Sequence, residues 1–197
     1  IEFFHSLTDG SGALVFLKNL VAEYLQQRYG VHIPAGRGVL GRLEPPREEE
    51  LEDSFPKYAG SVNASRKETD AWFPGGTQDP DGYLDLTCFT MDAAQVLERA
   101  HAHKVSVTTF LTAAVMAALQ ELQKEQVPDR RRRKAIKVLV PVDLRRIYPS
   151  SSLRNFALYS TPEIDPRLGD YSFREICDII KHTMGLEITA KNLSKTI

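Results

Sequence analysis

The segment 107–125 is the feature that most restricts how this chain can fold. Its apolar residues recur at helical spacing, so a helix here would carry a broad apolar face made of Phe110, Leu111, Ala114, Val115, Ala118, Leu119 and Leu122. Such a face must be covered by other elements. Residues 136–142, with the sequence IKVLVPV, follow as an apolar run typical of a buried strand. Together the two segments indicate a layered α/β fold.

The rest of the chain also alternates helical and strand patterns. We expect the end of a buried strand at 1–4, helices over 13–29 and 93–103 and one opening at Phe173, and strands at 83–91 and 156–161. Asp92 with Gln95, and Ser172 with Glu175, have the spacing of helix-capping boxes. Gly30 is placed to end the first helix. This order of elements predicts a mixed sheet.

Residues 31–82 separate the first helix from the later elements and are weakly patterned. Six prolines and several glycines predict a long excursion over the surface. Trp72, the only tryptophan, lies within it. It either lines a substrate channel or acts as an apolar plug that holds the loop against the core.

Composition excludes several classes of protein. The 25 basic and 26 acidic residues leave a net charge of −1, which gives no reason to expect nucleic acid as a partner. No apolar run is long enough for a membrane span. With only Cys88 and Cys177 present, we expect a reducing, cytoplasmic setting without disulfides, and no metal-ligand spacing is seen. The chain opens at Ile1 inside an apolar run, so we expect a fragment of a longer protein.

The stretch HSLTDGSG at residues 5–12 carries the chemistry that we single out. A histidine with a pKa near neutrality is the usual general base for a hydroxyl, amine or thiol, and a tight turn can fix the direction of its ring. Asp9 lies four residues later at the start of a helix, where a carboxylate is favoured as a cap. Gly10 and Gly12 leave room for close approach. From these residues alone, the alternative interpretation is that Asp9 only caps the helix and His5 is an ordinary loop residue.

The same stretch resembles the HxxxDG motif of the chloramphenicol acetyltransferase-like superfamily. This group includes the condensation domains of nonribosomal peptide synthetases, the plant BAHD acyltransferases and the alcohol acetyltransferases. The segments VTTFLTAAVMAAL at 107–119, VLVPVDLRR at 138–146 and LRNFAL at 153–158 are similar to elements that follow the motif in these families. The chain is most similar to bacterial alcohol acetyltransferase-like proteins. Condensation domains usually have a second histidine directly before the motif, where this chain has Phe4.

The resemblance implies roles for particular residues. His5 would be the catalytic general base, and Asp9 and Gly10 would support the site, with Asp9 paired to a distant arginine. Arg145 is the first choice for that arginine and Arg146 the second, although both also fit a solvated strand end. Asn155 and Ser152 are candidates for binding substrate or the oxyanion, and both also fit ordinary loop positions. No metal is implied.

For the fold, the resemblance implies a two-layer α/β sandwich with a mixed sheet, here an incomplete piece of a protein with two similar halves and a tunnel between them. Residues 1–60 would end the N-terminal half, 61–82 would cross over, and 83–197 would begin the C-terminal half. Self-association through uncovered helix faces is also expected.

For function, the resemblance implies transfer of an acetyl or short acyl group from a coenzyme A thioester to a small alcohol, without a covalent intermediate. Acetyl-CoA would be a co-substrate and no cofactor would be permanently bound. The alternatives are a carrier-protein-dependent acyltransferase or condensation domain, and a non-catalytic binding domain of the same fold. The basic run DRRRRK at 129–134 either meets the phosphates of coenzyme A or an acidic partner, or is a solvated connection.

Overall fold

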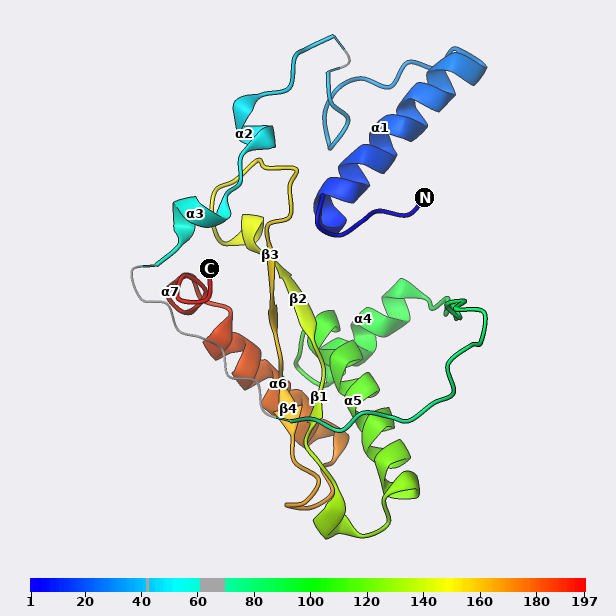
Figure 1. The fold of residues 1–197 in the computed structure, drawn as a ribbon, viewed down its shortest axis with the longest axis vertical. Helices are drawn as coiled ribbons and strands as arrows, with labels where there is room; N and C mark the ends of the chain where they lie inside the picture. The colour runs from blue at the N-terminus through cyan, green and yellow to red at the C-terminus, as the bar shows by residue number, and fades with distance from the viewer. Residues whose placement is uncertain (42, 61–69) are drawn as a thin grey trace. The chain divides into compact units, whose positions relative to one another are not determined.

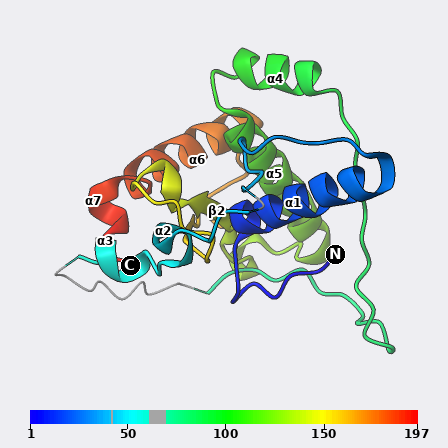
Figure 2. The same ribbon diagram turned by 90° about the horizontal axis from the view of Figure 1, so that it is seen from above.

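A computed structural model describes residues 1–41, 43–60 and 70–197, which divide into two compact units (Figures 1 and 2). Unit 1 consists of Ile1–Arg66, Pro141–Tyr159 and Thr189–Ile197, and unit 2 of Lys67–Val140 and Ser160–Ile188. Both units combine helices and strands, as the sequence predicts. The strands form two separate two-stranded sheets within the described residues, β1 with β4 and β2 with β3, where we expected one mixed sheet. The division of the chain into an N-terminal half, a crossover and a C-terminal half stays a prediction.

Unit 1 begins with a long helix. Its elements are α1 (Gly10–Tyr29), α2 (Glu48–Leu51), α3 (Phe55–Tyr58), most of β2 (Val140–Asp143) and β3 (Ala157–Ser160), a 3₁₀ turn at Leu144–Arg146, and α7 (Ala190–Leu193). Helix α1 starts three residues earlier than the predicted helix, because the Asp9 side chain caps it. Gly30 ends it in the left-handed conformation with φ 68°, as predicted.

An aromatic cluster holds the middle of unit 1 together. The rings of Phe55 and Phe156 meet edge to face with centroids 5.2 Å apart, and those of Tyr58 and Tyr148 stack at 4.7 Å. Tyr148 donates a hydrogen bond to the carbonyl of Ala190, so the cluster also holds α7. Both views show α7 beside α3, where the Gly60 amide donates to the Ser194 carbonyl (Figures 1 and 2).

Unit 2 is built around α5 and α6. Its elements are α4 (Ala93–Ala102), α5 (Val107–Gln126), a 3₁₀ turn at Arg130–Arg132, β1 (Ile136–Lys137), β4 (Glu163–Ile164) and α6 (Phe173–Glu187). Strands β1 and β4 pair antiparallel with Ile136 opposite Ile164, and both side chains enter the core. The capping box of Ser172 and Glu175 opens α6 as predicted, and Asp92 caps α4. Among the described residues no single helix could span a membrane, although α4 and α5 pass that test together as a pair bent by 83°.

Helix α5 forms where it was predicted, and Phe110 and Leu119 of the predicted apolar face pack against the core, but the most buried side of the helix is a different one. Thr109, Thr112, Gln120 and Gln123 face inward with Ala113 and Met116, whereas Leu111, Val115 and Leu122 of the predicted apolar face are exposed. Gln120 is tolerated because it bonds to backbone groups: it accepts from the Tyr171 amide and donates to the Tyr171 carbonyl. Gln123 donates to the Lys134 carbonyl, but its Oε1 has no hydrogen-bond partner within the described residues.

Three strand predictions need correction. Residues 1–4 and 83–91 form no strand, and Phe4 and Leu84 are exposed. Strands require neighbours for their backbone groups, and within the described part of the chain no other backbone bonds to residues 84–91. The run 136–142 is divided between β1 and β2, with Leu139 exposed between them.

Trp72 acts as a plug in unit 2. Its side chain packs against the core cluster of α5, α6, β1 and β4, and its amide donates to the Ala135 carbonyl over 2.8 Å. This placement favours the structural interpretation of Trp72 over that of a channel wall.

Strand β3 lies within the segment predicted at 156–161.

Candidate active site

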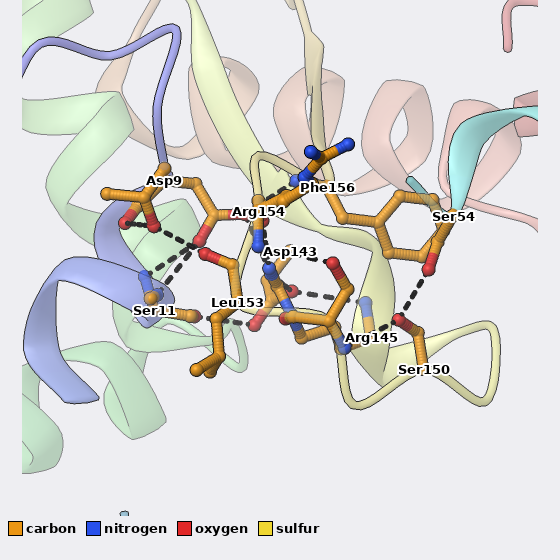
Figure 3. A network of polar contacts seen from close by, with 12 residues as sticks. Asp9, Ser11, Ser54, Asp143, Arg145, Ser150, Leu153, Arg154 and Phe156 are labelled. Atoms are coloured by element: carbon orange, nitrogen blue, oxygen red, sulfur yellow. Dashed lines mark hydrogen bonds and ion pairs between the residues drawn. The ribbon is translucent and has the colours of Figure 1, made fainter. Parts of the chain in front are cut away.

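Asp9 is the centre of a polar network in unit 1, and both of its carboxylate oxygens are in use (Figure 3). Oδ1 accepts hydrogen bonds from the amides of Ser11 and Gly12, each at 3.1 Å, and so caps α1. Oδ2 accepts from the Phe156 amide at 2.8 Å and from Arg145 Nη1 at 2.7 Å. The aspartate therefore caps the helix, as its position predicts, and also joins the start of α1 to Arg145 and Phe156.

Arg145 ties Asp9 to the loop that follows β2. Besides Asp9, its Nη1 donates to Asp143 Oδ1 at 2.9 Å. Its Nε donates to the Ser152 carbonyl at 2.8 Å and its Nη2 to the Arg154 carbonyl at 2.5 Å. The side chains of Arg145 and Asp9 are only 14% and 5% exposed, so this pair is not the solvated strand end that was the alternative for Arg145. Arg146, the second choice, is exposed.

The pairing of Asp9 with Arg145 is what the resemblance implies, and the structure contains it. The 3₁₀ turn Leu144–Arg146 orients Arg145 toward Asp9. Asp143 caps this turn, because its side chain accepts a hydrogen bond from the Arg145 amide at 3.1 Å. What these residues contribute to a reaction stays a prediction.

The network also keeps Asp9 ionised. Burial by itself would raise the pKa of the Asp9 carboxyl, but the hydrogen bonds from Phe156, Arg145 and Gly12 and the charge of Arg145 together hold that pKa below its usual value of 3.8. The carboxylate is therefore charged at neutral pH, and its oxygens are occupied by donors other than His5. It is not placed to relay a proton from the imidazole.

Two glycines follow Asp9, and only the second is required by packing. A Cβ atom on Gly10 would meet nothing within 4 Å, so the structure gives Gly10 no steric role. A Cβ atom on Gly12 would collide with Thr8 Oγ1 and with the carbonyl of Leu153. The Thr8 hydroxyl itself donates to that carbonyl at 2.7 Å, which holds the start of α1 against the loop at 150–155.

His5 lies in the turn just before this network, and its side chain is exposed. Beside the turn is a cleft of ≈ 420 Å³ lined by Ser6, Leu7, Asp53, Phe55, Arg154 and Asn155. The tunnel between two halves, into which His5 would point, stays a prediction.

The two remaining candidates lie in the loop before β3. Ser152 is buried, donates its hydroxyl proton to the Glu52 carbonyl and accepts from the Arg154 amide. Because the hydroxyl proton of Ser152 is already used in the hydrogen bond to the Glu52 carbonyl, a structural role is favoured over binding of an oxyanion. Asn155 Oδ1 is buried without a hydrogen-bond partner in the ranges that the structure describes. An unpaired buried amide oxygen costs about 1–3 kcal/mol, so a partner from elsewhere would be favourable here.

Sequence reasoning missed Asp143, Ser11 and Thr8. Asp143 Oδ2 accepts from the Ser11 hydroxyl at 2.8 Å while Oδ1 binds Arg145, so it joins α1 to the arginine (Figure 3). For Asp143, the signal in the sequence is its position two residues before Arg145, a spacing typical of a capped turn.

Within the described ranges no three His, Cys, Asp or Glu side chains gather closely enough to hold a metal ion.

Comparisons with known proteins find similarity among solved structures alone. No protein-family model and no curated protein matches the sequence. Among solved structures, the chain is similar to the first condensation domain of the CDA synthetase, with 18% identity, a TM-score of 0.46, and coverage of 95% of this chain and 40% of that chain. It is also similar to the first condensation domain of the calcium-dependent antibiotic synthetase in complex with a substrate analogue, with 15% identity, a TM-score of 0.48, and coverage of 95% and 42%. The chain thus spans less than half the length of these domains.

Proposed function

We propose that this chain is part of an enzyme that transfers an acyl group from a thioester on a phosphopantetheine arm to a nucleophile, with His5 as the general base. Coenzyme A and a carrier protein both present this thioester. The observation that carries the proposal is the double use of Asp9, which fixes the HSLTDG turn to α1 through one oxygen and to Arg145 through the other. A turn anchored in this way holds the backbone that carries His5 in a fixed position.

Acyl transfer from a thioester to a nucleophile requires one general base and two positioned substrates. The His5 imidazole would take the proton of an acceptor hydroxyl or amine, whose electron pair attacks the thioester carbonyl. The tetrahedral intermediate then expels the thiolate as the C–S bond breaks, and the imidazolium returns the proton to sulfur. Because Asp9 is occupied elsewhere, the imidazole would act without a carboxylate relay. The catalytic gain would come from proton transfer and from positioning of the two substrates.

The cleft beside the motif turn suits the acceptor. It contains the Ser6 and Leu7 positions next to His5, an apolar wall from Phe55, and polar groups from Asp53 and Asn155. Such a mixture of apolar surface and a few polar groups is typical of small-molecule sites. An alcohol acceptor with acetyl-CoA, favoured by the sequence, and an amine acceptor are both compatible with this lining.

The test uses the full-length protein and measures release of free thiol from acetyl-CoA and from an acetylated carrier protein, with alcohols and amines as acceptors. His5→Ala should lower turnover about 10²–10⁴-fold. His32→Ala removes a second exposed histidine and should leave the rate unchanged. An undiminished rate in His5→Ala would refute the base assignment, and no turnover with either donor would refute the function.

A further inference from the structure

The basic run at 129–134 is divided by the fold into two sets of side chains. Arg133 is used internally: its side chain is 10% exposed, its Nε donates to the Val127 carbonyl at 3.0 Å, and its Nη1 lies 3.4 Å from Asp170. Lys134 pairs with Asp70 at 2.6 Å. These two residues connect the end of α5 and the start of β1 to the rest of unit 2.

No such structural role is seen for the side chains of Arg130, Arg131 and Arg132 in the described part of the chain. All three are exposed, and within the described part of the chain none of them has an acidic partner. Their backbone is nevertheless well fixed, because Asp129 accepts from the Arg131 amide through its side chain and from the Arg132 amide through its carbonyl, each at 3.0 Å. Three guanidinium groups are therefore held on a structured 3₁₀ turn.

The acids beside this turn form no ion pair with its three guanidinium groups in the described part of the chain. The Asp129 carboxylate is bonded to the backbone of the turn, and Asp170 is already paired with both Arg133 and Lys124. A chain with a net charge of −1 thus carries, in the part that the structure describes, three exposed arginines without an acidic partner on one turn.

We propose that Arg130, Arg131 and Arg132 form a docking surface for an acidic protein. Resting on the proposed function, we further infer that this protein is the carrier that delivers the acyl thioester. Arginine pairs with carboxylates in a bidentate manner and is enriched at protein interfaces. The backbone amides of Arg131, Arg132 and Arg133 are bonded within the turn, so a small phosphate would find side chains alone. Nucleic acid is disfavoured because binding would require a longer basic stripe.

The test compares two donors for the same reaction in the full-length protein: an acetylated acidic carrier protein, and acetyl-pantetheine, which has no protein surface. Reversing the charges in Arg130→Glu/Arg131→Glu/Arg132→Glu should raise the KM for the carrier about tenfold or more, because electrostatic steering is lost. The kcat, and all parameters with acetyl-pantetheine, should stay unchanged. High salt should abolish the difference between parent and variant.

A matched control separates docking from net charge. Arg174→Glu/Lys191→Glu/Lys195→Glu changes the same charge at exposed positions elsewhere and should leave the KM for the carrier near the parent value. Equal effects of the two triple variants, or no effect of the first, would overturn the proposal.

Direct binding makes failure of the docking surface distinguishable from failure of the function. Fluorescence anisotropy of a labelled carrier should show binding that the Arg130–Arg132 variant loses. Binding of this kind without any turnover would support the docking surface and refute the function. If the Arg130–Arg132 variant turns over the acylated carrier as efficiently as the parent does, the docking surface is refuted and the proposed function is not. Tighter binding of a DNA oligonucleotide than of the carrier would overturn the acidic-protein assignment.

Discussion

Gly12, in the first turn of α1, lies directly against the carbonyl group of Leu153, in the loop before β3. A Cβ atom at Gly12 would lie 3.2 Å from the Leu153 carbonyl carbon and closer still to its oxygen. The same carbonyl accepts the Thr8 hydroxyl. This close approach lets Asp9 reach Arg145, and it makes Gly12 rather than Gly10 the glycine on which the site depends.

Gly12→Ala should therefore destabilise the protein by about 2 kcal/mol, because the backbone contact cannot give way as a flexible side chain would. Gly10→Ala is the matched control and should change the free energy of unfolding by less than about 0.5 kcal/mol, since its Cβ would enter open space. Urea unfolding of both variants measures the difference. Equal stability of the two would contradict the close approach at Leu153.

Asp9→Asn should cost about 3 kcal/mol of stability. The amide leaves Arg145 without its partner in a site where both side chains are nearly buried, and it turns an NH₂ group toward other donors. Asp143→Asn, which changes a partner that is 30% exposed, should cost only about 1 kcal/mol. Thermal and urea unfolding give both values. An Asp9→Asn protein with full stability but no activity would indicate that the carboxylate takes part in the reaction directly.

The pH dependence of stability follows from the lowered pKa of Asp9. Because the folded protein holds this pKa below 3.8, the unfolded chain binds more protons between the two pKa values, and stability falls as the pH falls through that window. The difference in free energy of unfolding between the parent and Asp9→Asn should be constant above about pH 5 and shrink below about pH 4. A difference that stays constant into the acid range would show that Asp9 is not stabilised as a carboxylate.

In unit 2, Gln120→Ala should destabilise the protein by about 2 kcal/mol. The side chain is 3% exposed and satisfies both the amide and the carbonyl of Tyr171, at 2.9 and 3.0 Å, so its removal leaves two backbone groups unpaired. Gln126→Ala, at the exposed end of the same helix, is the control and should have little effect. Similar unfolding midpoints for the two variants would contradict the inward orientation of Gln120.

The sequence by itself determined the local elements whose signals are contained in neighbouring residues. The periodicity of α1, α5 and α6, the caps at Asp9, Asp92 and Ser172, and the glycine that ends α1 all follow from interactions within one or two turns. The choice of Arg145 as the partner of Asp9 came from the resemblance of the HSLTDGSG stretch to a family motif rather than from such local rules.

Only the tertiary structure decided what depends on contacts between distant segments. Residues 83–91 alternate like a strand but find no neighbour in the described part of the chain, and α5 buries its glutamines because Tyr171 and Lys134 offer backbone partners. Asp143 and Gly12 became part of the site because the loop at 150–155 folds against α1. Hydrogen bonding and close packing between segments far apart in sequence are set by the folded chain as a whole, and no periodicity of residues records them.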